Sequence, residues 1–336
     1  MKKVGILTGG GDCPGLNAVI RATVRRAQGF SIEVLGIRNG FLGLIEGDAE
    51  PLTSFSVSGI LPKGGTILGT SRTNPLASDE VRGRFQGNFE RYGLDALIVV
   101  GGDGTLSAAR ELHALGVPVI GVPKTIDNDL RGTDYTFGFD TAVSVVCDAV
   151  DRLHTTAESH HRVMVVEVMG RRVGWIATHG GLAGGADFIL IPEKPYRLED
   201  MCAVLERRRR RGRHFSIVVV AEGAAPMGEP PPARLGEGGT SGVGYHVAEE
   251  ISKRLGVETR VTVLGHIQRG GSPTAFDRNL ATRFGIRALD LAHERRFGQM
   301  VGLQGTRVVP VTLEEATAGP KYVDLEQYAD AEVFFG

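Results

Sequence analysis

The sequence predicts an α/β protein with two doubly wound lobes, each built around a mostly parallel sheet. Short apolar runs alternate with stretches of helical spacing along the 336 residues, which is the order of a parallel α/β fold. Glycine-rich turns follow the apolar runs, as they do where a strand leads into a crossover helix. A chain of this length forms two lobes more naturally than one.

The composition narrows the classes of function. Lys and Arg number 38 and Asp and Glu 39, which argues against a general nucleic-acid binder, so an anion site must come from local clusters. Cys13, Cys147 and Cys202 are far apart, which argues against a disulfide framework or a zinc site and fits a reducing compartment. No signal peptide or membrane-spanning segment is evident. We therefore expect a cytoplasmic protein with neither a membrane nor a nucleic-acid partner.

The first strand, turn and helix open the chain. An apolar strand over residues 4–8 leads into the loop Gly9–Gly15, and residues 16–27 have helical apolar spacing. Adjacent glycines expose backbone N–H groups at a helix start, where the helix dipole favours an anion. A tight turn without a ligand is the alternative, and the loop matches neither a P-loop nor a dinucleotide fingerprint. We interpret this loop, which includes Gly11, as a phosphate site.

The same arrangement recurs further along the chain. A strand over residues 95–100 ends in Gly101-Gly102-Asp103-Gly104-Thr105, and a helix is predicted over 106–115. A glycine loop can cradle phosphates, and a carboxylate beside it can hold the magnesium ion that bridges them. Between the two units, after a strand over 32–37, Arg72 is either a surface arginine or a phosphate ligand.

The most informative stretch is Pro123-Lys124-Thr125-Ile126-Asp127-Asn128-Asp129, which follows a buried strand over residues 117–122. Ligands bind at the carboxyl ends of strands in open parallel sheets. Asp127 and Asp129 need a cation, a metal or a proton to abstract, whereas the alternative is an Asx-rich turn with solvated side chains. Beside the loop 101–105, this stretch predicts a phosphoryl-donor site next to a candidate base.

The second half of the chain repeats the alternation of strand, turn and helix. Asp140 is expected to cap a long helix, and His160 and His161 favour a polar loop over a metal site. The run Arg207–Arg211 is expected to be a solvated helix end, since cations suit that end of the helix dipole. Residues 224–242 are expected to form a surface excursion. The expected strands are 163–168, 189–191 and 217–221, and the expected helices begin at Trp175 and cover 198–205 and 274–291.

A basic stretch follows near residue 260. A predicted strand carries Arg260 at one end and His266 and Arg269 at the other. Two arginines, an imidazole and a glycine turn would suit a dianionic sugar phosphate, and a basic turn without a ligand is the alternative.

Five motifs in order give a family resemblance. They are Gly-Gly-Gly-Asp-x-Pro-Gly, Gly-Gly-Asp-Gly-Thr, Pro-Lys-Thr-Ile-Asp-Asn-Asp, Val-Glu-Val-Met-Gly-Arg and Leu-Gly-His-Ile-Gln-Arg-Gly-Gly. Together they resemble 6-phosphofructokinase over nearly the whole chain. The resemblance implies transfer of the γ-phosphoryl group of ATP to the 1-hydroxyl of fructose 6-phosphate, with Mg²⁺, in a homotetramer or a homodimer. Pyrophosphate is the alternative donor.

The resemblance also implies a discontinuous lobe order. The donor-binding lobe would comprise residues 1–138 and 268–318, and the sugar-phosphate-binding lobe residues 139–267 and 319–336. The strand from Val261 onward would rejoin the first lobe.

The resemblance implies a role for each residue that matches a family motif. Asp127 would be the base for the 1-hydroxyl, with Thr125 and Asp129 beside it, and Arg171 would steady the transferring phosphoryl group. Asp103 would hold the magnesium ion. The donor would be lined by Gly11, Arg72, Thr73, Gly102, Asp103, Gly104 and Thr105. The sugar phosphate would be held by Thr125, Asp127, Arg162, Met169, Gly170, Arg171, Glu222, Arg260, His266 and Arg269, with Arg162 and Arg260 reaching it from a neighbouring subunit.

Two positions bear on the choice of donor. Pyrophosphate-using relatives carry aspartate at the place of Gly104 and lysine at the place of Lys124, whereas nucleotide-using relatives typically carry glycine at both. Gly104 leaves bare backbone where an α-phosphate would lie, and Lys124 can turn toward solvent or pair with a phosphate. We therefore predict ATP as the donor. Phe41 replaces a tyrosine found near the donor in many nucleotide-using members.

The chain keeps only some of the arginines that bind effectors in regulated members of the family. Arg21 and Arg25 match effector-site arginines of regulated bacterial members, but Ser54 and His154 replace two others, which predicts weak effector control. Two other classes of protein are alternatives: a lipid or NAD kinase, which would share only Gly-Gly-Asp-Gly-Thr, and a catalytically silent sugar-phosphate sensor. The stretches around Asp127 and His266 argue against the kinase, and the presence of Asp127, Asp103 and Arg171 argues against the silent sensor.

Overall fold

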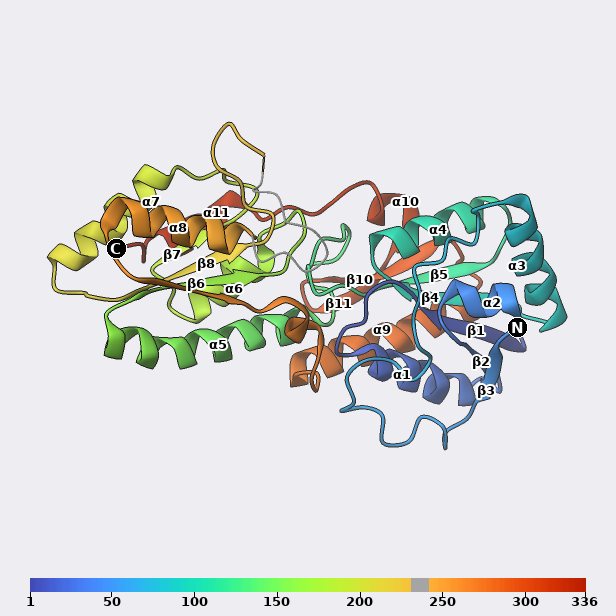
Figure 1. Cartoon of the computed structure of the whole chain (residues 1–336). Helices are drawn as coiled ribbons and strands as arrows, with labels where there is room; N and C mark the ends of the chain where they lie inside the picture. Colours follow the sequence, from blue (N-terminus) through green and yellow to red (C-terminus); the bar gives the residue numbers. More distant parts are fainter. Residues whose placement is uncertain (231–241) are drawn as a thin grey trace. The chain divides into compact units, whose positions relative to one another are not determined.

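The computed structural model of the protein describes residues 1–230 and 242–336 (Figure 1). The predicted surface excursion over 224–242 lies largely outside the described residues. Two compact units are present, one formed by Met1–Thr141 and Arg269–Pro320, the other by Ala142–Gln268 and Lys321–Gly336. Within the described ranges, no helix is long and apolar enough to cross a membrane.

A seven-stranded sheet forms the centre of the first unit. Its strand order is β11-β10-β5-β4-β1-β2-β3, and neighbouring strands are parallel except for β2 with β3 and β10 with β11. The strands β4 and β5 are apolar along their length, and β1 is apolar between Lys3 and Thr8, because helices cover both faces of the sheet. The strands are β1 (Lys3–Thr8), β2 (Glu33–Ile37), β3 (Ala49–Leu52), β4 (Ala96–Gly101), β5 (Val119–Pro123), β10 (Gln299–Gln304) and β11 (Arg307–Thr312).

Helices cover the two faces of this sheet (Figure 1). Helices α1 and α9 pack together on one face, and α2, α3, α4 and α10 cover the other. The helices are α1 (Leu16–Gln28), α2 (Phe41–Glu46), α3 (Asp79–Arg91), α4 (Asp103–Ala114), α9 (Ala275–His293) and α10 (Leu313–Ala316), and α5 (Phe139–His160) begins in this unit.

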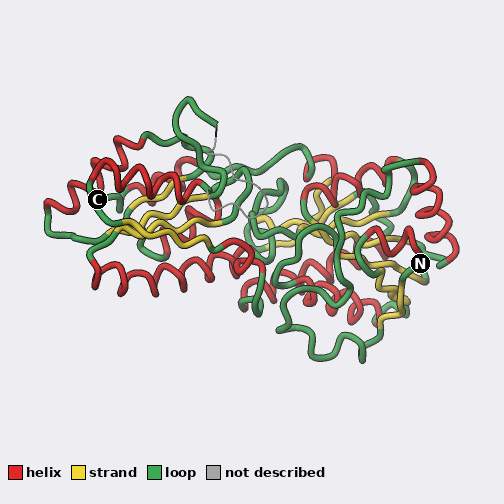
Figure 2. Tube along the Cα trace, viewed as in Figure 1, coloured by secondary structure: helices red, strands yellow, loops and turns green. Residues whose placement is uncertain are grey.

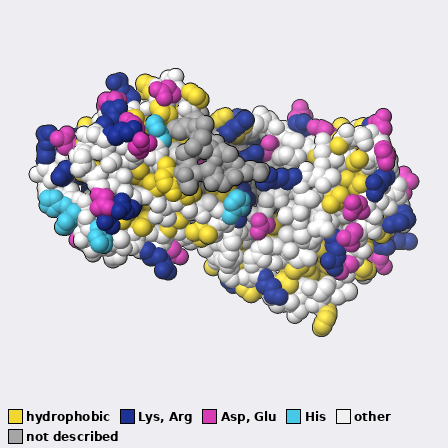
Figure 3. All heavy atoms as spheres, viewed as in Figure 1, with side chains coloured by type: hydrophobic (Ala, Val, Ile, Leu, Met, Phe, Trp, Pro, Cys, Tyr) yellow, Lys and Arg dark blue, Asp and Glu magenta, His cyan; other side chains and the backbone are white. Residues whose placement is uncertain are grey.

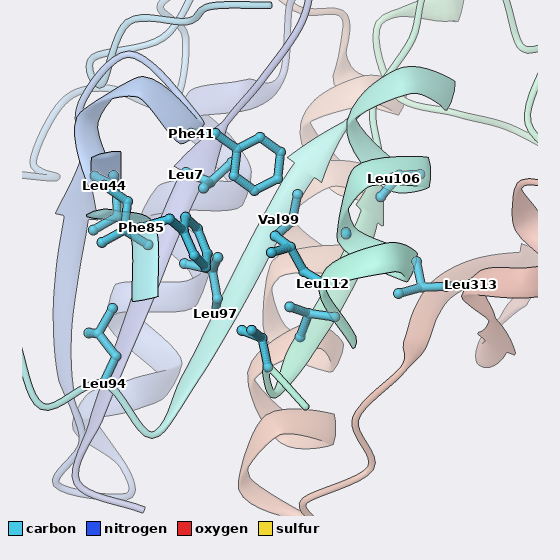
Figure 4. Close-up of a cluster of buried hydrophobic side chains, with 14 of the residues drawn as sticks. Leu7, Phe41, Leu44, Phe85, Leu94, Leu97, Val99, Leu106, Leu112 and Leu313 are labelled. Atoms are coloured by element: carbon cyan, nitrogen blue, oxygen red, sulfur yellow. The ribbon is translucent and has the colours of Figure 1, made fainter. Parts of the chain in front are cut away.

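The core on the α2–α4 face fixes the strands whose ends carry the candidate site. In Figure 4 Leu7, Leu97 and Val99 project from the sheet toward Phe41 and Phe85, and all five side chains are buried. Burial of a Leu or Phe side chain stabilises the fold by about 1.5–3 kcal/mol. This packing holds the ends of β1 and β4 side by side.

The second unit contains a smaller sheet with all its strand pairs parallel. The strand order is β7-β8-β6-β9 (Figure 2). One core cluster joins alternate residues of β6 and β8 to α7 and α8. The strands are β6 (Val163–Val168), β7 (Phe188–Leu190), β8 (Ser216–Ala221) and β9 (Thr259–Val263). The helices are α6 (Trp175–Ala183), α7 (Leu198–Arg210), α8 (Val243–Leu255), the 3-10 helix η1 (Gly265–Arg269) and α11 (Leu325–Glu332).

The predicted fold class is confirmed, since both units are α/β with mostly parallel strands. The expectation that the strand from Val261 onward rejoins the first lobe is wrong. Strand β9 pairs in parallel register with β6, from Val163 with Thr259 to Glu167 with Val263, so it belongs to the second sheet. The free edge of β6 accepts this strand, and the chain re-enters the first unit only at Arg269.

Two local predictions are also corrected. Asp140 does not precede α5 as a cap, because the helix already begins at Phe139. The Asp140 carboxylate instead accepts a hydrogen bond from Thr274 Oγ1 at 2.6 Å, and Thr274 caps α9. The strand near Arg260 ends at Val263, and His266 lies on η1.

Candidate active site

The first glycine loop follows β1 and is held by side chains from distant parts of its unit. Thr70 Oγ1 donates a hydrogen bond to the Gly10 carbonyl at 2.6 Å, and the Lys124 ammonium donates to the Gly11 carbonyl. Gly10 has φ +80°, a conformation that strongly favours glycine. A Cβ at Gly11 would lie 2.6 Å from Arg269 Nη1, so a side chain there would displace the arginine. The loop backbone is therefore fixed and bare.

The second glycine loop joins β4 to α4. Helix α4 begins at Asp103, earlier than predicted, because the Gly102 carbonyl accepts hydrogen bonds from the backbone N–H groups of Thr105 (3.0 Å) and Leu106 (2.9 Å). The Thr105 side chain fills the space beside Gly9 and Gly101, where added Cβ atoms would lie 2.7 and 2.3 Å from it. The two glycine loops thus pack through one threonine.

Asp103 and Gly104 occupy the exposed start of α4. A Cβ at Gly104 would meet no atom within 4 Å, so packing does not require glycine at this position. The space above the first turn of α4 is open to a ligand. The start of a helix also favours a negatively charged ligand.

The stretch after β5 is buried. Asp127 is 3% exposed, and its backbone N–H donates to Thr125 Oγ1 at 3.1 Å. Thr136 donates through its hydroxyl to the Thr125 carbonyl (2.7 Å) and through its N–H to Asn128 Oδ1 (3.0 Å). Asn128 has φ +53°, which turns the chain sharply between the two aspartates. The alternative of a solvated turn is therefore wrong, because tertiary packing excludes water from Asp127.

Lys124 points inward to the first glycine loop. It is 4% exposed, so the option of a side chain turned to solvent is also wrong. Burial lowers the pKa of the ammonium, and the nearby Cys13, Asp127 and Asp12 oppose this shift. The lysine places its side-chain nitrogen between the Gly11 carbonyl and the β5 loop.

Arg72 and Arg269 approach the first glycine loop differently. Arg72 is exposed next to Ser71, whose carbonyl accepts a hydrogen bond from the Gly10 N–H at 2.9 Å. Thr73 is partly buried beside it, and its N–H lies 3.4 Å from Ser71 Oγ. Arg269 donates to the Asp12 carbonyl at 3.2 Å. Sequence reasoning missed this contact, because nothing local links residues 257 positions apart.

In the second unit, the turn after β6 carries Met169, Gly170 and Arg171. Gly170 has φ +152°, and a Cβ there would lie 2.4 Å from the Val173 carbonyl oxygen, so only glycine fits. Arg171, with φ +53°, donates its backbone N–H to Glu222 Oε1 at 2.8 Å. Glu222 follows β8 and donates its own N–H to the Val168 carbonyl at 2.8 Å. The adjacent ends of β6 and β8 thus bring Arg171 and Glu222 together.

Arg162 and Arg260 lie at the other end of these strands, joined by Glu258. Arg162 Nε is 2.8 Å from the Glu258 carboxylate, and Arg260 forms an ion pair with the same group. The hydrogen bond from Arg162 lowers the pKa of Glu258. Sequence reasoning missed Glu258, which directly precedes β9 and stands two residues before Arg260.

The structure therefore divides the predicted sugar-phosphate residues of the second unit into two groups. One group stands at the carboxyl ends of the strands, where His266 on η1 also lies, and the other at the amino ends of β6 and β9. Six residues of strand separate the groups, about 20 Å at 3.3 Å per residue.

The side chains available as metal ligands suit a magnesium ion that is bound mainly by the phosphate oxygens of the enzyme's substrate. The described residues contain no cluster of three or more His, Cys, Asp or Glu side chains able to hold a metal. Magnesium commonly binds through one or two carboxylates and substrate phosphates, with water completing its octahedron. Exposed Asp103 beside two glycine loops provides such a carboxylate.

Comparison with known proteins gives consistent matches. The family model described as phosphofructokinase matches residues 3–292. The chain is 55% identical to a pyrophosphate–fructose 6-phosphate 1-phosphotransferase of Streptomyces coelicolor, over 99% of this chain and all of that protein. It is 50% identical to ATP-dependent 6-phosphofructokinase 2 of the same organism, with the same coverage. The solved phosphofructokinase of Saccharomyces cerevisiae superposes with a TM-score of 0.86 at 33% identity, over 99% of this chain and 46% of that chain.

Proposed function

The chain belongs to the phosphofructokinase family, and we propose that it transfers the γ-phosphoryl group of ATP to the 1-hydroxyl of fructose 6-phosphate. Such a reaction is a step of glycolysis. The observation that supports it best is the buried Asp127, held on the β5 loop beside two fixed glycine loops. Relatives named pyrophosphate–fructose 6-phosphate 1-phosphotransferase and ATP-dependent 6-phosphofructokinase align over 99% of the chain.

Asp127 would take the proton of the 1-hydroxyl as the oxygen attacks the phosphoryl group. A general base must be positioned within hydrogen-bond reach, and the contacts of Thr125, Asn128 and Thr136 restrict the loop that carries it. Thr125 and Asp129 would assist at the same loop.

The donor phosphates would lie against the glycine loops. Gly11, Gly102 and Thr105 would contact them, with Arg72 and Thr73 at the rim, and Asp103 would hold Mg²⁺ bound to the phosphate oxygens. Bound magnesium would neutralise charge that develops on the transferring group. Lys124 holds its side-chain nitrogen next to Gly11, and its protonated form there would favour any phosphate donor.

Gly104 supports ATP in particular. The space around a Cβ at this position is open, so an aspartate would fit sterically but would direct a carboxylate into the region where an α-phosphate is expected. Two like unit charges 4 Å apart near a protein surface repel by roughly 4 kcal/mol, a repulsion that the glycine avoids. Pyrophosphate is the second candidate, because Lys124 is turned to the first glycine loop and three relatives at 53–55% identity are named for that donor.

In the second unit, Met169, Gly170, Arg171, Glu222 and His266 would contact the sugar phosphate. Arg171 would also steady the transferring phosphoryl group. Arg162 and Arg260, at the opposite strand ends, would serve the site of a neighbouring subunit in a homotetramer or homodimer. A sugar-binding role for Arg269 stays a prediction, since its described contact is with the Asp12 carbonyl. We propose a cytoplasmic location.

A coupled assay of the purified protein with fructose 6-phosphate and Mg²⁺ tests the proposal, with ATP and pyrophosphate compared as donors. We expect turnover with ATP and little with pyrophosphate. Efficient turnover with pyrophosphate alone would show that Lys124 dominates Gly104. No turnover with either donor would overturn the proposed reaction.

A further inference from the structure

The base loop, residues 125–129, carries the candidate base and is closed by the chain that follows it. Residues 130–136, the return segment, bring the chain back to the end of β5, where Lys124 and Phe137 form a parallel bridge. Thr136, the last residue of the return segment, makes the hydrogen bonds to the base loop described above. Whatever fixes the return segment therefore also fixes the base loop.

The hairpin of β10 and β11 runs alongside this part of the chain. Strand β10 pairs in parallel with β5, Gln299 beside Ile120 and Met300 beside Gly121. Continued in the same register, β10 extends beyond Pro123, where β5 ends. The far end of the hairpin is therefore available to the return segment instead of to the sheet.

Thr133 joins the return segment to the hairpin through a buried hydroxyl group. The hydroxyl accepts a hydrogen bond from the Leu303 N–H on β10 at 3.0 Å and donates one to the Tyr135 carbonyl at 2.7 Å. Thr133 is 4% exposed, so water has little access to either partner. Removing the hydroxyl would leave a donor on the hairpin and an acceptor on the return segment without this bond, which is costly for buried groups.

Asp134 adds further hydrogen bonds between the same pieces. Its backbone N–H donates to the Leu303 carbonyl at 2.8 Å, so both backbone polar groups of Leu303 are bonded to the return segment. Its carboxylate accepts from the Gly305 N–H, in the turn of the hairpin, at 2.7 Å. Its carbonyl accepts from Asn128 Nδ2 at 3.2 Å. Because Asn128 stands between the two aspartates of the base loop, Asp134 links the hairpin to that loop directly.

The hairpin and the return segment also pack closely. A Cβ at Gly302 would lie 2.2 Å from the Gly132 carbonyl oxygen, and a Cβ at Gly132 would lie 2.4 Å from Val311 Cγ1. Gly132 has φ +75°, a conformation that also favours glycine. These two glycines allow the backbone of the return segment to lie directly against β10 and β11.

We propose that the β10–β11 hairpin positions the catalytic base, with Thr133 as the positioning residue through which it holds the loop of Asp127. This inference rests on the proposed function, in which Asp127 takes the proton of the sugar hydroxyl. A general base acts only within hydrogen-bond reach of that proton, and a misplacement of about 1 Å can cost about 10²-fold in rate. The hairpin follows residues 3–292, which the family model matches, and carries none of the site residues predicted from the sequence.

Thr133→Val in the full chain tests the proposal, because valine keeps the shape of threonine and removes the hydroxyl. With the donor that the wild type uses, we expect kcat to fall about tenfold while KM for fructose 6-phosphate stays within about twofold. Hydrogen–deuterium exchange read by mass spectrometry should be faster in peptides that cover the base loop. Thr133→Ser keeps the hydroxyl and should restore both readouts.

Thr317→Val is the matched control. Its hydroxyl also has two partners in the first unit, accepting from Arg110 Nη1 at 3.0 Å and donating to the Leu313 carbonyl at 2.8 Å, and neither partner belongs to the base loop or the return segment. This variant should keep the kcat of the wild type. Both valine substitutions leave the charge unchanged, so the acidic and basic side chains that Figure 3 shows interspersed around α2 and α3 keep the same field on the anionic substrates.

Asp134→Ala provides a second test if Thr133→Val does not fold by circular dichroism. Asp134 is exposed, and the alanine variant removes only its side-chain bond to Gly305. Asp134→Asn removes the same charge but keeps an oxygen that can accept this bond. We expect kcat to fall about threefold in Asp134→Ala and to stay near the wild-type value in Asp134→Asn. Equal kcat in the alanine and asparagine variants would overturn the proposal.

The outcomes separate the positioning role from the proposed function. Wild-type kcat in Thr133→Val, or an equal fall of kcat in Thr317→Val, would overturn the role of the hairpin even if the base loop exchanges faster. A wild-type protein that transfers no phosphoryl group from either donor would overturn the proposed function itself, and this result is known before any variant is made.

Discussion

The two units present their candidate ligand groups in different ways. In the first unit, β1 and β4 end in glycine loops whose bare backbone is held by side chains such as Lys124 and Thr105. In the second unit, the strand ends carry charged residues held by carboxylates. Glu222 accepts a hydrogen bond from the backbone N–H of Arg171 at one end, and Glu258 pairs with the Arg162 side chain at the other. Glycine loops expose backbone N–H groups, which allows close contact with phosphates. Charged side chains instead attract an anion and so raise its affinity. Substitutions should therefore affect chemistry or donor choice in the first unit and sugar-phosphate affinity in the second.

The largest effect is expected at the base. Asp127→Asn keeps the shape of the side chain and removes its basicity, so kcat should fall by about 10² to 10⁴ while sugar-phosphate affinity changes little. Steady-state kinetics would measure both quantities. Asp79→Asn, an exposed carboxylate on α3, is the control and should leave kcat unchanged. More than a tenth of wild-type turnover in Asp127→Asn would remove Asp127 from the role of base.

The next effect concerns the donor. Gly104→Asp should reduce kcat/KM for ATP by at least about tenfold, because the carboxylate repels the α-phosphate. Gly87→Asp on α3 is a matched control, since a Cβ there also meets no atom within 4 Å. Lys124→Gly should be milder for ATP. Equal kcat/KM for ATP in Gly104→Asp and the wild type would show that position 104 does not face the nucleotide.

A smaller effect concerns stability in the first unit. Burial raises the pKa of Asp277 to about 6, although Thr141 donates two hydrogen bonds to its carboxylate, at 2.6 and 2.8 Å. A raised carboxyl pKa favours the folded state below the ordinary value near 3.9, and this contribution is lost as the pH rises through about 6. Relative to Asp277→Asn, the wild type should lose about 1–2 kcal/mol of unfolding free energy between pH 5 and 7.5.

Urea unfolding of both proteins at several pH values would measure this difference. The asparagine variant keeps an oxygen to accept hydrogen bonds from Thr141 and has no titrating group at the site. A constant difference across the range would show that Asp277 titrates in the folded protein as it does in the unfolded chain.

The smallest effect is expected at the arginine pair of the second unit. Arg162→Ala should raise KM for fructose 6-phosphate about tenfold with little change in kcat, because one charge-assisted hydrogen bond of about 1.5 kcal/mol is lost. Arg152→Ala, an exposed arginine on α5, is the control. Glu258→Gln should raise KM less, since both arginines remain.

Mixing Arg162→Ala with Asp127→Asn protein tests whether sites are shared. If Arg162 serves a neighbour, hybrid assemblies contain some intact sites and should recover part of the lost activity. No recovery after verified subunit exchange would count against sites shared between subunits.

Local sequence determined the fold class and most strands and helices of this protein. Alternating apolar runs and glycine turns encode βα units because the side-chain period and the turn conformation are properties of a few adjacent residues. Patterns of a few adjacent residues also identified the loops that carry Gly11, Asp103 and Asp127. The hairpin formed by β10 and β11 is less evident in the sequence, because Pro310 lies within its second strand and proline is unfavourable in a strand pattern.

Only the tertiary structure decided which groups meet. Lys124 was expected to face solvent or a phosphate, but its ammonium contacts the Gly11 carbonyl because burial of the β5 loop leaves it no route to water. Arg269 contacts the Asp12 carbonyl, and β9 pairs with β6 in the second sheet. These contacts join residues tens to hundreds of positions apart, and their free energy depends on packing and desolvation that no local pattern contains.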